Sequence, residues 1–574
     1  MWCVHLLSVC LLARVVKSCE VQIDETRQDI HWWKTSVIYQ IYPRSFKDSN
    51  GDGIGDLNGI TSKLEHIKDA GADALWLSPI YKSPQKDFGY DISDFRDIDP
   101  TYGTLADFDR LVAKAKSLKL KVLLDFVPNH SSDDHEWFKK SEQRIDPYTN
   151  YYVWADGKNN NPSVPPNNWL SNFGGSAWKW SETRKQYYYH AFVDRQPDLN
   201  YRDEKLRQEM EDILTFWMKR GVDGFRVDAI NQMFETTDLK DEPISGKTDD
   251  PNDYDYLIHN QTRDLNETYD VVGSWQKLID NHVRNYRTDG KLMILEAYTT
   301  IPRSMMYYDV GSNPFNFMFV ATLNNQSTPE HFKKTIDTWL NAVPEGKVSN
   351  WVSGNHDNHR VATRFGENGR ADQIPMLCSM LPGIMVVYNG DEIGMVDRDF
   401  SFEETVDPAG CNAGEEKYED KSRDPERTPY QWDSTTSAGF SSSPITWLPV
   451  HQNYVTLNLA AQKNAQNSHY KVFQALTKLK KTPVLLKGKT ELFIINNQVL
   501  AVVRRLKGEK SVVLLINFNN DQALTLDVKA HINLSDNVTV YTSSVESGFK
   551  VNDNLDANNL VLPKRASLII FSDI

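Results

Sequence analysis

The segment Gly224–Ala229 carries an arginine and a carboxylate two residues apart at the end of a short apolar run. Side chains alternate between the two faces of a strand, so Arg226 and Asp228 are expected on the same face. A nearby positive charge favours the ionised form of a carboxyl group. Asp228 is therefore a candidate nucleophile, although a single Arg-x-Asp is more often a structural ion pair.

Further apolar runs also end in reactive side chains: one in Asp125 to His130, one in Glu296, and one in His356 and Asp357. In a parallel barrel the functional residues sit at the carboxyl ends of the strands. Each fragment alone is weak evidence, since Asn-His-Asp is also common in turns. Together the strand ends would bring carboxylates and histidines to one face.

This combination indicates cleavage of a glycosidic bond, which needs one carboxylate as nucleophile and one protonated carboxyl as acid. Arg226 would keep Asp228 ionised, whereas an apolar site with Asp228 nearby would raise the pKa of Glu296. We therefore expect Asp228 to attack and Glu296 to donate a proton. Asp357 would accept hydrogen bonds from sugar hydroxyls and help to distort the ring.

The elements that must position these residues alternate along the chain. Segments of helical periodicity, such as Thr104–Leu118 and Glu204–Arg220, separate fully apolar runs, which is typical of a parallel sheet covered by helices. The runs are Val37–Tyr42, Ala74–Pro79, Val122–Pro128, Gly224–Asp228, Met293–Ala297, Asn350–Asp357 and Ile384–Tyr388. We predict a (β/α)8 TIM barrel whose missing strand lies near Phe315–Val320. An open doubly wound sheet is the alternative, disfavoured because no glycine-rich phosphate loop follows the first run.

Two regions interrupt the alternation. Residues 131–200 are rich in Trp, Tyr, Asn, Pro and Gly, which indicates a subdomain B inserted after strand 3. From residue 485 the pattern becomes β-like and predicts a C-terminal antiparallel β-sandwich. The expected division is a signal peptide at 1–19, the catalytic barrel at 32–130 and 201–484, subdomain B at 131–200, and the C-terminal domain at 485–574.

Composition and charge narrow the partners. The chain has 574 residues, enough for two or three domains, and a net charge of −14, which argues against nucleic acids and anionic membranes. The apolar run Val4 to Ala13 predicts a secretory signal peptide, and no later run is long enough to span a membrane. We expect a secreted, extracellular glycoprotein. Sequons lie at Asn260, Asn266, Asn325, Asn533 and Asn537, and a sixth at Asn129 is not expected to be modified.

An acidic loop runs from Asp48 to Asp56, with oxygen-bearing side chains alternating with glycines. Such a pattern suits a hard cation such as Ca²⁺. Its start matches an EF-hand loop, but the twelfth position is Gly59 instead of glutamate, so no EF-hand is predicted. A glycine-rich turn without an ion is the alternative.

Whether Cys378 and Cys411 form a disulfide stays open.

The ordered set of strand-end residues resembles the α-amylase family of glycoside hydrolases, family 13. That set is Asp125, His130, Arg226, Asp228, Glu296, His356 and Asp357. Other segments resemble the α-glucosidase and oligo-1,6-glucosidase branch of that family, and point to the secreted insect α-glucosidases (maltases). They are Val37–Phe46, Gln196–Asn200 and Ser422–Pro429. The resemblance covers roughly residues 32–574.

The resemblance implies roles for individual residues. Asp228 matches the nucleophile, Glu296 the acid/base and Asp357 the transition-state stabiliser. Implied substrate-binding residues are His130 and His356 as donors to the glucose, Tyr90 as stacking platform, Arg226 as partner of the nucleophile, Asp87 and Arg423 as the pair closing the pocket, and Phe173 and Phe192 at its mouth. Implied ligands of a structural Ca²⁺ are Asp48, Asn50, Asp52, the Ile54 carbonyl and Asp56. No organic cofactor is expected.

The predicted function is a retaining, exo-acting α-glucosidase that releases α-1,4-linked glucose from maltose, sucrose and short oligosaccharides. Ala229 supports α-1,4 linkages, because a valine after the nucleophile goes with α-1,6 specificity in the branch that the chain resembles. Alternatives are an oligo-1,6-glucosidase, a transglycosylating sucrase, or a non-catalytic protein like the heavy chains of amino-acid transporters. The last is disfavoured, since those proteins have a membrane helix and have lost catalytic carboxylates. Monomer and homodimer remain open.

Overall fold

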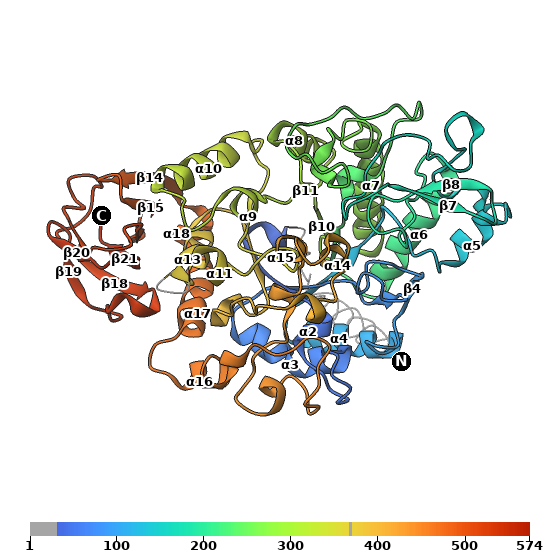
Figure 1. The fold of residues 1–574 in the computed structure, drawn as a ribbon. Helices are drawn as coiled ribbons and strands as arrows, with labels where there is room; N and C mark the ends of the chain where they lie inside the picture. The colour runs from blue at the N-terminus through green and yellow to red at the C-terminus, as the bar shows by residue number, and fades with distance from the viewer. Residues whose placement is uncertain (1–30, 367–369) are drawn as a thin grey trace, which may run out of the picture.

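The computed structural model describes residues 31–366 and 370–574, so the predicted signal peptide at 1–19 lies outside the described residues. Figure 1 shows a barrel region with strands and helices around it, and a separate β-rich lobe at the C-terminal end of the chain. No helix within the described ranges is long and apolar enough to cross a membrane.

Eight parallel strands form the central sheet, in the order β11-β10-β9-β5-β2-β1-β13-β12. They are β1 Val37–Ile41, β2 Ala74–Leu77, β5 Lys121–Phe126, β9 Gly224–Val227, β10 Leu292–Leu295, β11 Asn313–Pro314, β12 Asn350–Val352 and β13 Ile384–Tyr388. The first strand, β1, lies between β2 and the last strand, β13, and β12 follows β13. This is the cyclic order of a barrel. A doubly wound sheet would instead continue outward in increasing order. The predicted barrel is confirmed.

The predicted position of the missing strand was wrong. The sixth barrel strand is β11, a two-residue strand, and residues Met318–Thr322 form the short helix α9. Periodicity alone cannot separate a short apolar strand from a buried helical turn. The segment is apolar because Phe315, Phe317 and Val320 help to fill the inside of the barrel.

The side chain of Asn350 joins the two ends of the sheet. Its Nδ2 donates to the carbonyl of Pro314 at 2.7 Å, and its Oδ1 accepts from the amide of Asn316 at 2.7 Å. Asn350 on β12 is fully buried, and the segment that it contacts includes β11. One amide side chain therefore bridges the strands between which no backbone ladder is assigned.

Asn350→Ala should lower the free energy of unfolding by about 2–5 kcal/mol, because it leaves two buried backbone groups without partners, each costing roughly 1–3 kcal/mol. Differential scanning calorimetry would show this as a lower melting temperature. The control is Asn285→Ala at an exposed position of helix α7, Glu267–Tyr286. Equal melting temperatures of the two variants would contradict the bridging role.

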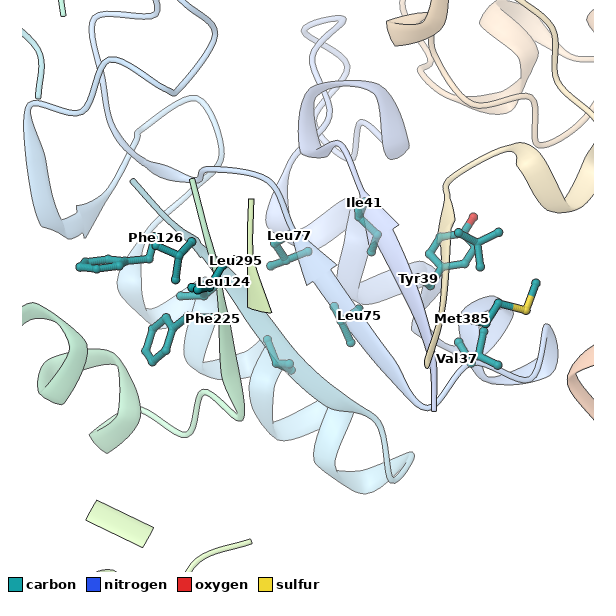
Figure 2. Close-up of a cluster of buried hydrophobic side chains, with 14 of the residues drawn as sticks. Val37, Tyr39, Ile41, Leu75, Leu77, Leu124, Phe126, Phe225, Leu295 and Met385 are labelled. Carbon is teal, nitrogen blue, oxygen red and sulfur yellow. The ribbon is translucent and has the colours of Figure 1, made fainter. Parts of the chain in front are cut away.

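Strand side chains alternate between two apolar layers. Figure 2 shows side chains of the layer between strands and helices, including Val37, Tyr39 and Ile41 of β1. The intervening residues, such as Ile38 and Ile294, belong to a second cluster inside the barrel. This alternation decides which residues beyond each strand end point into the barrel mouth.

Helices surround the sheet. They are α3 Leu57–Asp69, α4 Leu105–Ser117, α6 Glu204–Lys219, α7, α8 Ile301–Asp309, α10 Pro329–Ala342, α13 Gln373–Met380 and α17 His469–Lys480, with the shorter α2 Pro43–Phe46, α5 Glu136–Glu142, α11 Val361–Phe365, α14 Pro408–Ala413, α15 Tyr418–Lys421, α16 Leu459–Asn464 and α18 Pro483–Lys487. The helix expected at Thr104–Leu118 begins after its N-cap, Thr104, whose side chain forms a capping box with Asp107.

Three further β regions lie outside the barrel sheet. Between β2 and α4, β3 Tyr81–Lys82 and β4 Asp94–Ile98 form a two-stranded antiparallel sheet. Between β5 and β9 lies a three-stranded antiparallel sheet of β6 Trp154–Ala155, β8 Gln186–Tyr189 and β7 Trp178–Ser181. The C-terminal region has a six-stranded sheet of β14 Lys489–Ile495, β15 Val499–Arg505, β16 Ser511–Asn517, β21 Ser567–Ser572, β18 Asn537–Ser543 and β19 Asn554–Asp556, and a two-stranded sheet of β17 Leu524–Leu526 and β20 Leu560–Leu562. The expected boundaries at residues 131, 201 and 485 remain a division that we propose.

Both faces of the C-terminal sheet are buried. On β15, Leu500 and Val502 join the cluster that runs into the barrel helices, whereas Ala501 and Val503 join a separate apolar cluster of the C-terminal region. The two free cysteines, buried Cys378 and exposed Cys411, form no disulfide with each other.

Candidate active site

Three neighbouring strands deliver charged side chains to the barrel mouth. Leu123 and Ile294 point into the barrel. Because side chains two residues apart on a strand point the same way, Asp125 and Glu296 lie above them on the same side. On β9, between these strands, Arg226 pairs in register with Asp125 on one side and with Ile294 on the other. The apolar barrel interior therefore ends in a charged layer.

Arg226 holds three carboxylates at once. Its Nη1 lies 2.7 Å from Asp125 Oδ1 and 2.5 Å from Asp228 Oδ1, and its Nη2 lies 2.8 Å from Glu296 Oε2. The guanidinium is 1% exposed and stacks over Trp76, with its central carbon 5.2 Å from the ring centroid. One buried cation thus fixes the relative positions of Asp228 and Glu296.

The two carboxyls differ in acidity. Burial raises the pKa of Asp228 to about 6, although Arg226 opposes this shift. Burial also raises the pKa of Glu296 to about 8, with further contributions from the charges of Asp228 and Asp357. A hydrogen bond between the two carboxyls favours the ionised form of Asp228. At neutral pH the pair therefore holds one proton on Glu296 and a negative charge on Asp228, which is the predicted order.

We expect a bell-shaped dependence of kcat/KM on pH. Activity should rise through about pH 6 as Asp228 loses its proton, and fall through about pH 8 as Glu296 loses the proton that it must donate. Initial rates of glucose release from maltose between pH 4 and 10 would measure both limbs. The two apparent pKa values describe the coupled pair of carboxyls, not either residue alone. A flat profile across this range would contradict the assignment.

Asp357 follows β12 and carries a charge at neutral pH. Its Oδ1 lies 2.8 Å from Arg427 Nη2 and 3.3 Å from Arg423 Nη1. Burial alone would raise the pKa of Asp357, but nearby positive charge outweighs it and holds the pKa below its usual range. Because burial lowers the pKa of neighbouring His356 well below its usual value and keeps the ring neutral, the two guanidiniums supply that charge.

A cavity of about 380 Å³ opens above these groups. Nine of the eleven predicted catalytic and substrate-binding residues line it: Asp87, Tyr90, His130, Phe173, Phe192, Asp228, Glu296, Asp357 and Arg423. Arg226 and His356 lie beneath its wall, with 1% and 0% of their surface exposed. The structure thus brings together residues that are up to 336 positions apart in the chain.

The structure places His356 as a support under the cavity wall. Its Nδ1 lies 2.8 Å from Gln40 Nε2, and its Nε2 lies 2.7 Å from the Tyr90 hydroxyl. The Tyr90 ring also stacks on the imidazole, with centroids 5.3 Å apart. Both ring nitrogens have partners within the protein, and the role of His356 as a donor to the glucose stays a prediction. His130 lines the cavity instead, and burial lowers its pKa to about 4.

An ion-pair network forms one part of the cavity wall. Arg423 Nη2 lies 2.9 Å from Asp87 Oδ1 and 2.6 Å from Asp407 Oδ1. Gln196, the first residue of the segment Gln196–Asn200, donates to the other oxygen of Asp87 at 3.1 Å. The expected Asp87–Arg423 pair is therefore formed, and Asp407 anchors its arginine.

Two aromatic side chains form the part of the cavity wall next to Arg423. Phe173 and Phe192 pack edge to face with centroids 5.7 Å apart. Phe173 also lies under the guanidinium of Arg423, at 5.0 Å, and Phe192 contacts the ring of His130. Both rings line the cavity and are only partly buried, as expected for its mouth.

Several residues at the site were missed from the sequence. Arg427 contacts Asp357, and its Nε donates to the carbonyl of His356 at 2.7 Å. Asp407 was missed because no motif surrounds it. Further lining residues are Asn172, Ala229, Asn231, Gln232, Arg263, Tyr298 and Asn358. Tyr298 and Asn358 could have been found from their position near strand ends. Tyr298 lies two residues after Glu296, and Asn358 directly follows Asp357.

The acidic loop is held by hydrogen bonds to its own carboxylates. Asp48 accepts from the amides of Asn50, Gly51 and Gly53, and Asp56 caps α3 by accepting from the amide of Gly59. Within the described ranges, one group of three His, Cys, Asp or Glu side chains has ligand atoms within 4.8 Å of one another, and it lies elsewhere. Asp48, Asn50, Asp52, the Ile54 carbonyl and Asp56 therefore stay predicted ligands of a Ca²⁺ ion.

Comparison with known proteins is consistent with the geometry. Residues 40–488 match the alpha amylase catalytic domain. The chain is 49% identical to Maltase 1 of Drosophila virilis, over 95% of this chain and 88% of that protein, and 46% identical to an alpha-glucosidase of Apis mellifera, over 90% of each. It is also 37% identical to the human amino acid transporter heavy chain SLC3A1, over 94% of this chain and 78% of that protein.

Solved structures agree in fold. The alpha-glucosyl transfer enzyme XgtA is 34% identical with a TM-score of 0.82, covering 94% of this chain and 99% of that one. The trehalulose synthase MutB of Pseudomonas mesoacidophila MX-45 is 30% identical with a TM-score of 0.81 and the same coverage. Together with the barrel and its carboxylate cluster, these matches show that the chain belongs to the α-amylase family of glycoside hydrolases.

Proposed function

We propose that the protein is a retaining, exo-acting α-glucosidase that releases glucose from the non-reducing end of maltose, sucrose and short oligosaccharides. The observation that carries this proposal is the pair Asp228 and Glu296, held on one guanidinium with different pKa values at the wall of a cavity of about 380 Å³. Relatives named maltase and alpha-glucosidase support it.

The proposed mechanism has two displacements. Asp228 Oδ attacks the anomeric carbon while Glu296 protonates the leaving oxygen, which gives a glucosyl ester on Asp228 and the free aglycone. Glu296, now ionised, takes a proton from water, which attacks the ester and releases α-glucose. Both carboxyls lie on the same guanidinium, which supports the short separation that a retaining pair needs. Asp357 would bind sugar hydroxyls.

Exo action follows from the closed end of the cavity. The pair of Asp87 and Arg423 blocks extension of a sugar chain beyond the terminal glucose, and its charged groups offer hydrogen bonds to hydroxyls at that end. An enzyme that cuts inside long chains would need an open cleft there.

Asp87→Ala should lower kcat/KM for maltose by about 10- to 100-fold, because a hydrogen bond to a charged group contributes roughly 1.5–3 kcal/mol. Arg423 would remain paired with Asp407, so the effect should come mainly from lost sugar contacts. Steady-state kinetics with Asp94→Ala, at an exposed carboxylate, provides the control. Unchanged kinetics of Asp87→Ala would contradict the proposed pocket end.

Linkage preference depends on the residue after the nucleophile. Ala229 lines the cavity, donates its amide to Glu296 Oε2 at 2.9 Å, and has a left-handed backbone with φ of 44°. A β-branched side chain is strongly disfavoured in that conformation. A small residue therefore fits this position, which supports α-1,4 over α-1,6 bonds.

A substrate panel tests the function. Maltose, sucrose, isomaltose, trehalose and starch would be offered, and the anomer released first would be read by NMR. We expect α-glucose from maltose and sucrose, little product from isomaltose and almost none from starch. Initial β-glucose would exclude retention, and good cleavage of isomaltose without cleavage of maltose would overturn the linkage assignment.

Glucosyl transfer is a second candidate, favoured by the solved relatives named as a glucosyl transfer enzyme and a trehalulose synthase. In this reaction a sugar hydroxyl replaces water as the second nucleophile. High concentrations of sucrose or maltose would then yield new disaccharides and less free glucose, which chromatography of the panel reactions would detect.

We also propose secretion, which the salivary alpha-glucosidases among the relatives support. The five expected sequons are exposed, whereas Asn129 is fully buried. Substrates would be small oligosaccharides, and monomer and homodimer both fit this proposal. The Ca²⁺ ion at Asp48–Asp56 stays a prediction, to be tested by the melting temperature with and without Ca²⁺.

A further inference from the structure

A second group of potential ligands lies beside the active site. His359 Nδ1 lies 2.7 Å from Asp397 Oδ2 and 3.8 Å from Glu426 Oε2. The three atoms come from three separate segments: the loop after β12, the stretch that follows β13, and the 3-10 turn Pro425–Arg427. None of these side chains lines the 380 Å³ cavity.

Glu426 is the unusual member of this group. It is 1% exposed, and its Oε2 has no hydrogen-bond partner although it faces the imidazole of His359. An ionised carboxylate in this position is costly unless a cation neutralises it.

Two other buried carboxylates near the site show what a satisfied one looks like. Glu392 Oε1 accepts from the hydroxyls of Tyr39 and Tyr430 and contacts His66. Asp407 is paired with Arg423. Glu426 Oε2 has no such donor, and it faces the point where His359 and Asp397 converge.

We propose that His359, Asp397 and Glu426 form a binding site for a divalent transition metal of the Zn²⁺ type. One imidazole nitrogen and two carboxylate oxygens are ligands that Zn²⁺ accepts, and the 2.7 and 3.8 Å separations bracket the spacing of ligands around a tetrahedral ion. Half of the His359 side chain is exposed, which leaves an entry path and room for water as fourth ligand.

The surroundings support such a site. Asp397 Oδ1 accepts from the backbone amide of Arg360 at 2.8 Å, which orients the carboxylate and leaves Oδ2 directed at His359. Outer hydrogen bonds of this kind commonly hold metal ligands in place. The carbonyl of His359 is likewise held by Arg364 at 2.9 Å.

The position gives the metal a structural role. His359 lies two residues after Asp357, and Glu426 directly precedes Arg427, which contacts Asp357. An ion bound by both ligands would tie the loop that carries Asp357 to the turn that carries its arginine partner. The alternative is a protonated His359 that bridges the two carboxylates without a metal.

Isothermal titration of the chelator-treated full chain with ZnCl₂ distinguishes these cases. The wild-type protein should bind one equivalent in the micromolar range or tighter, and Zn²⁺ should raise its melting temperature. His359→Ala should weaken binding by about tenfold or more, equivalent to about 1.4 kcal/mol or more. Glu426→Gln, which keeps the shape of the side chain, should have the same effect.

His531→Ala, at an exposed histidine of the C-terminal region, controls for adventitious surface binding and should bind Zn²⁺ like the wild type. Asp52→Asn controls for the acidic loop and should also retain Zn²⁺ binding. The proposal is overturned if wild-type protein binds no Zn²⁺ in the micromolar range, or if His359→Ala binds it as tightly as His531→Ala. Binding is read by heat and by melting, so failure of the proposed glucosidase function would not affect the outcome.

Discussion

Asp228→Asn is expected to lower kcat/KM for maltose by about 10⁴-fold or more, the scale found when a catalytic nucleophile is removed. Asparagine has nearly the same shape but cannot form the glucosyl ester. Arg226 would keep its contacts to Asp125 and Glu296, so the site should stay assembled. Glucose release, measured with a coupled assay, reads the effect directly.

The matched control is Asp212→Asn on an exposed position of α6, which should leave both activity and melting temperature unchanged. Mass spectrometry of wild-type protein trapped with a slow fluorinated substrate should place the label on Asp228. Substantial glucose release by Asp228→Asn would show that the nucleophile is another residue.

Glu296→Gln is expected to lower kcat/KM for maltose by about 10²- to 10⁴-fold, the usual contribution of general acid catalysis. The loss should be much smaller for an aryl α-glucoside with a good leaving group, because such a group departs without a proton. Since the mutated side chain no longer titrates, the alkaline limb near pH 8 should also disappear.

Kinetics with both substrates and with Glu330→Gln, at an exposed position of α10, test this assignment. A nucleophile defect would slow both substrates alike, so the two variants are distinguishable. Equal losses of Glu296→Gln on maltose and on the aryl glucoside would rule out Glu296 as the acid.

Asp228→Asn and Glu296→Gln also test whether the protein is catalytic at all, since one relative is named as a transporter heavy chain. The chain is 37% identical to an amino acid transporter heavy chain, so family membership alone does not establish catalysis. The geometry of the site is stronger support for catalysis, because Asp228 and Glu296 share Arg226 and differ in acidity. Wild-type protein without any glucosidase activity would favour the non-catalytic alternative.

Much of the site could be predicted from local sequence. Strand alternation puts Arg226 and Asp228 on one face, and the carboxyl ends of parallel strands meet at one edge of a barrel. Asp125 and Glu296 therefore had to approach Arg226 once the barrel was predicted. The order of acidity between Asp228 and Glu296 was also predictable. The neighbouring arginine alone suggested a low pKa for Asp228, whereas burial raises this pKa to about 6.

The features that could not be predicted depend on contacts between distant segments. β11 is too short to have a periodic pattern; it pairs with β10 through the backbone and is linked to β12 by the side chain of Asn350. Whether His356 lines the cavity or supports it depends on Gln40, which is 316 positions away. Arg427 could not be told from Arg423 by spacing, because the partner of each is set by the fold.

The sequence by itself determined the barrel, the strand ends that carry charge, and the family, because each depends on short-range periodicity or on motifs of a few residues. Only the tertiary structure decided which guanidinium contacts which carboxylate, that the pair of Asp87 and Arg423 lines the cavity, and that Glu426 Oε2 lies without a hydrogen-bond partner beside His359. The physical reason is that charge and burial act through space, so pKa values and ion pairs depend on neighbours that the order of residues does not reveal.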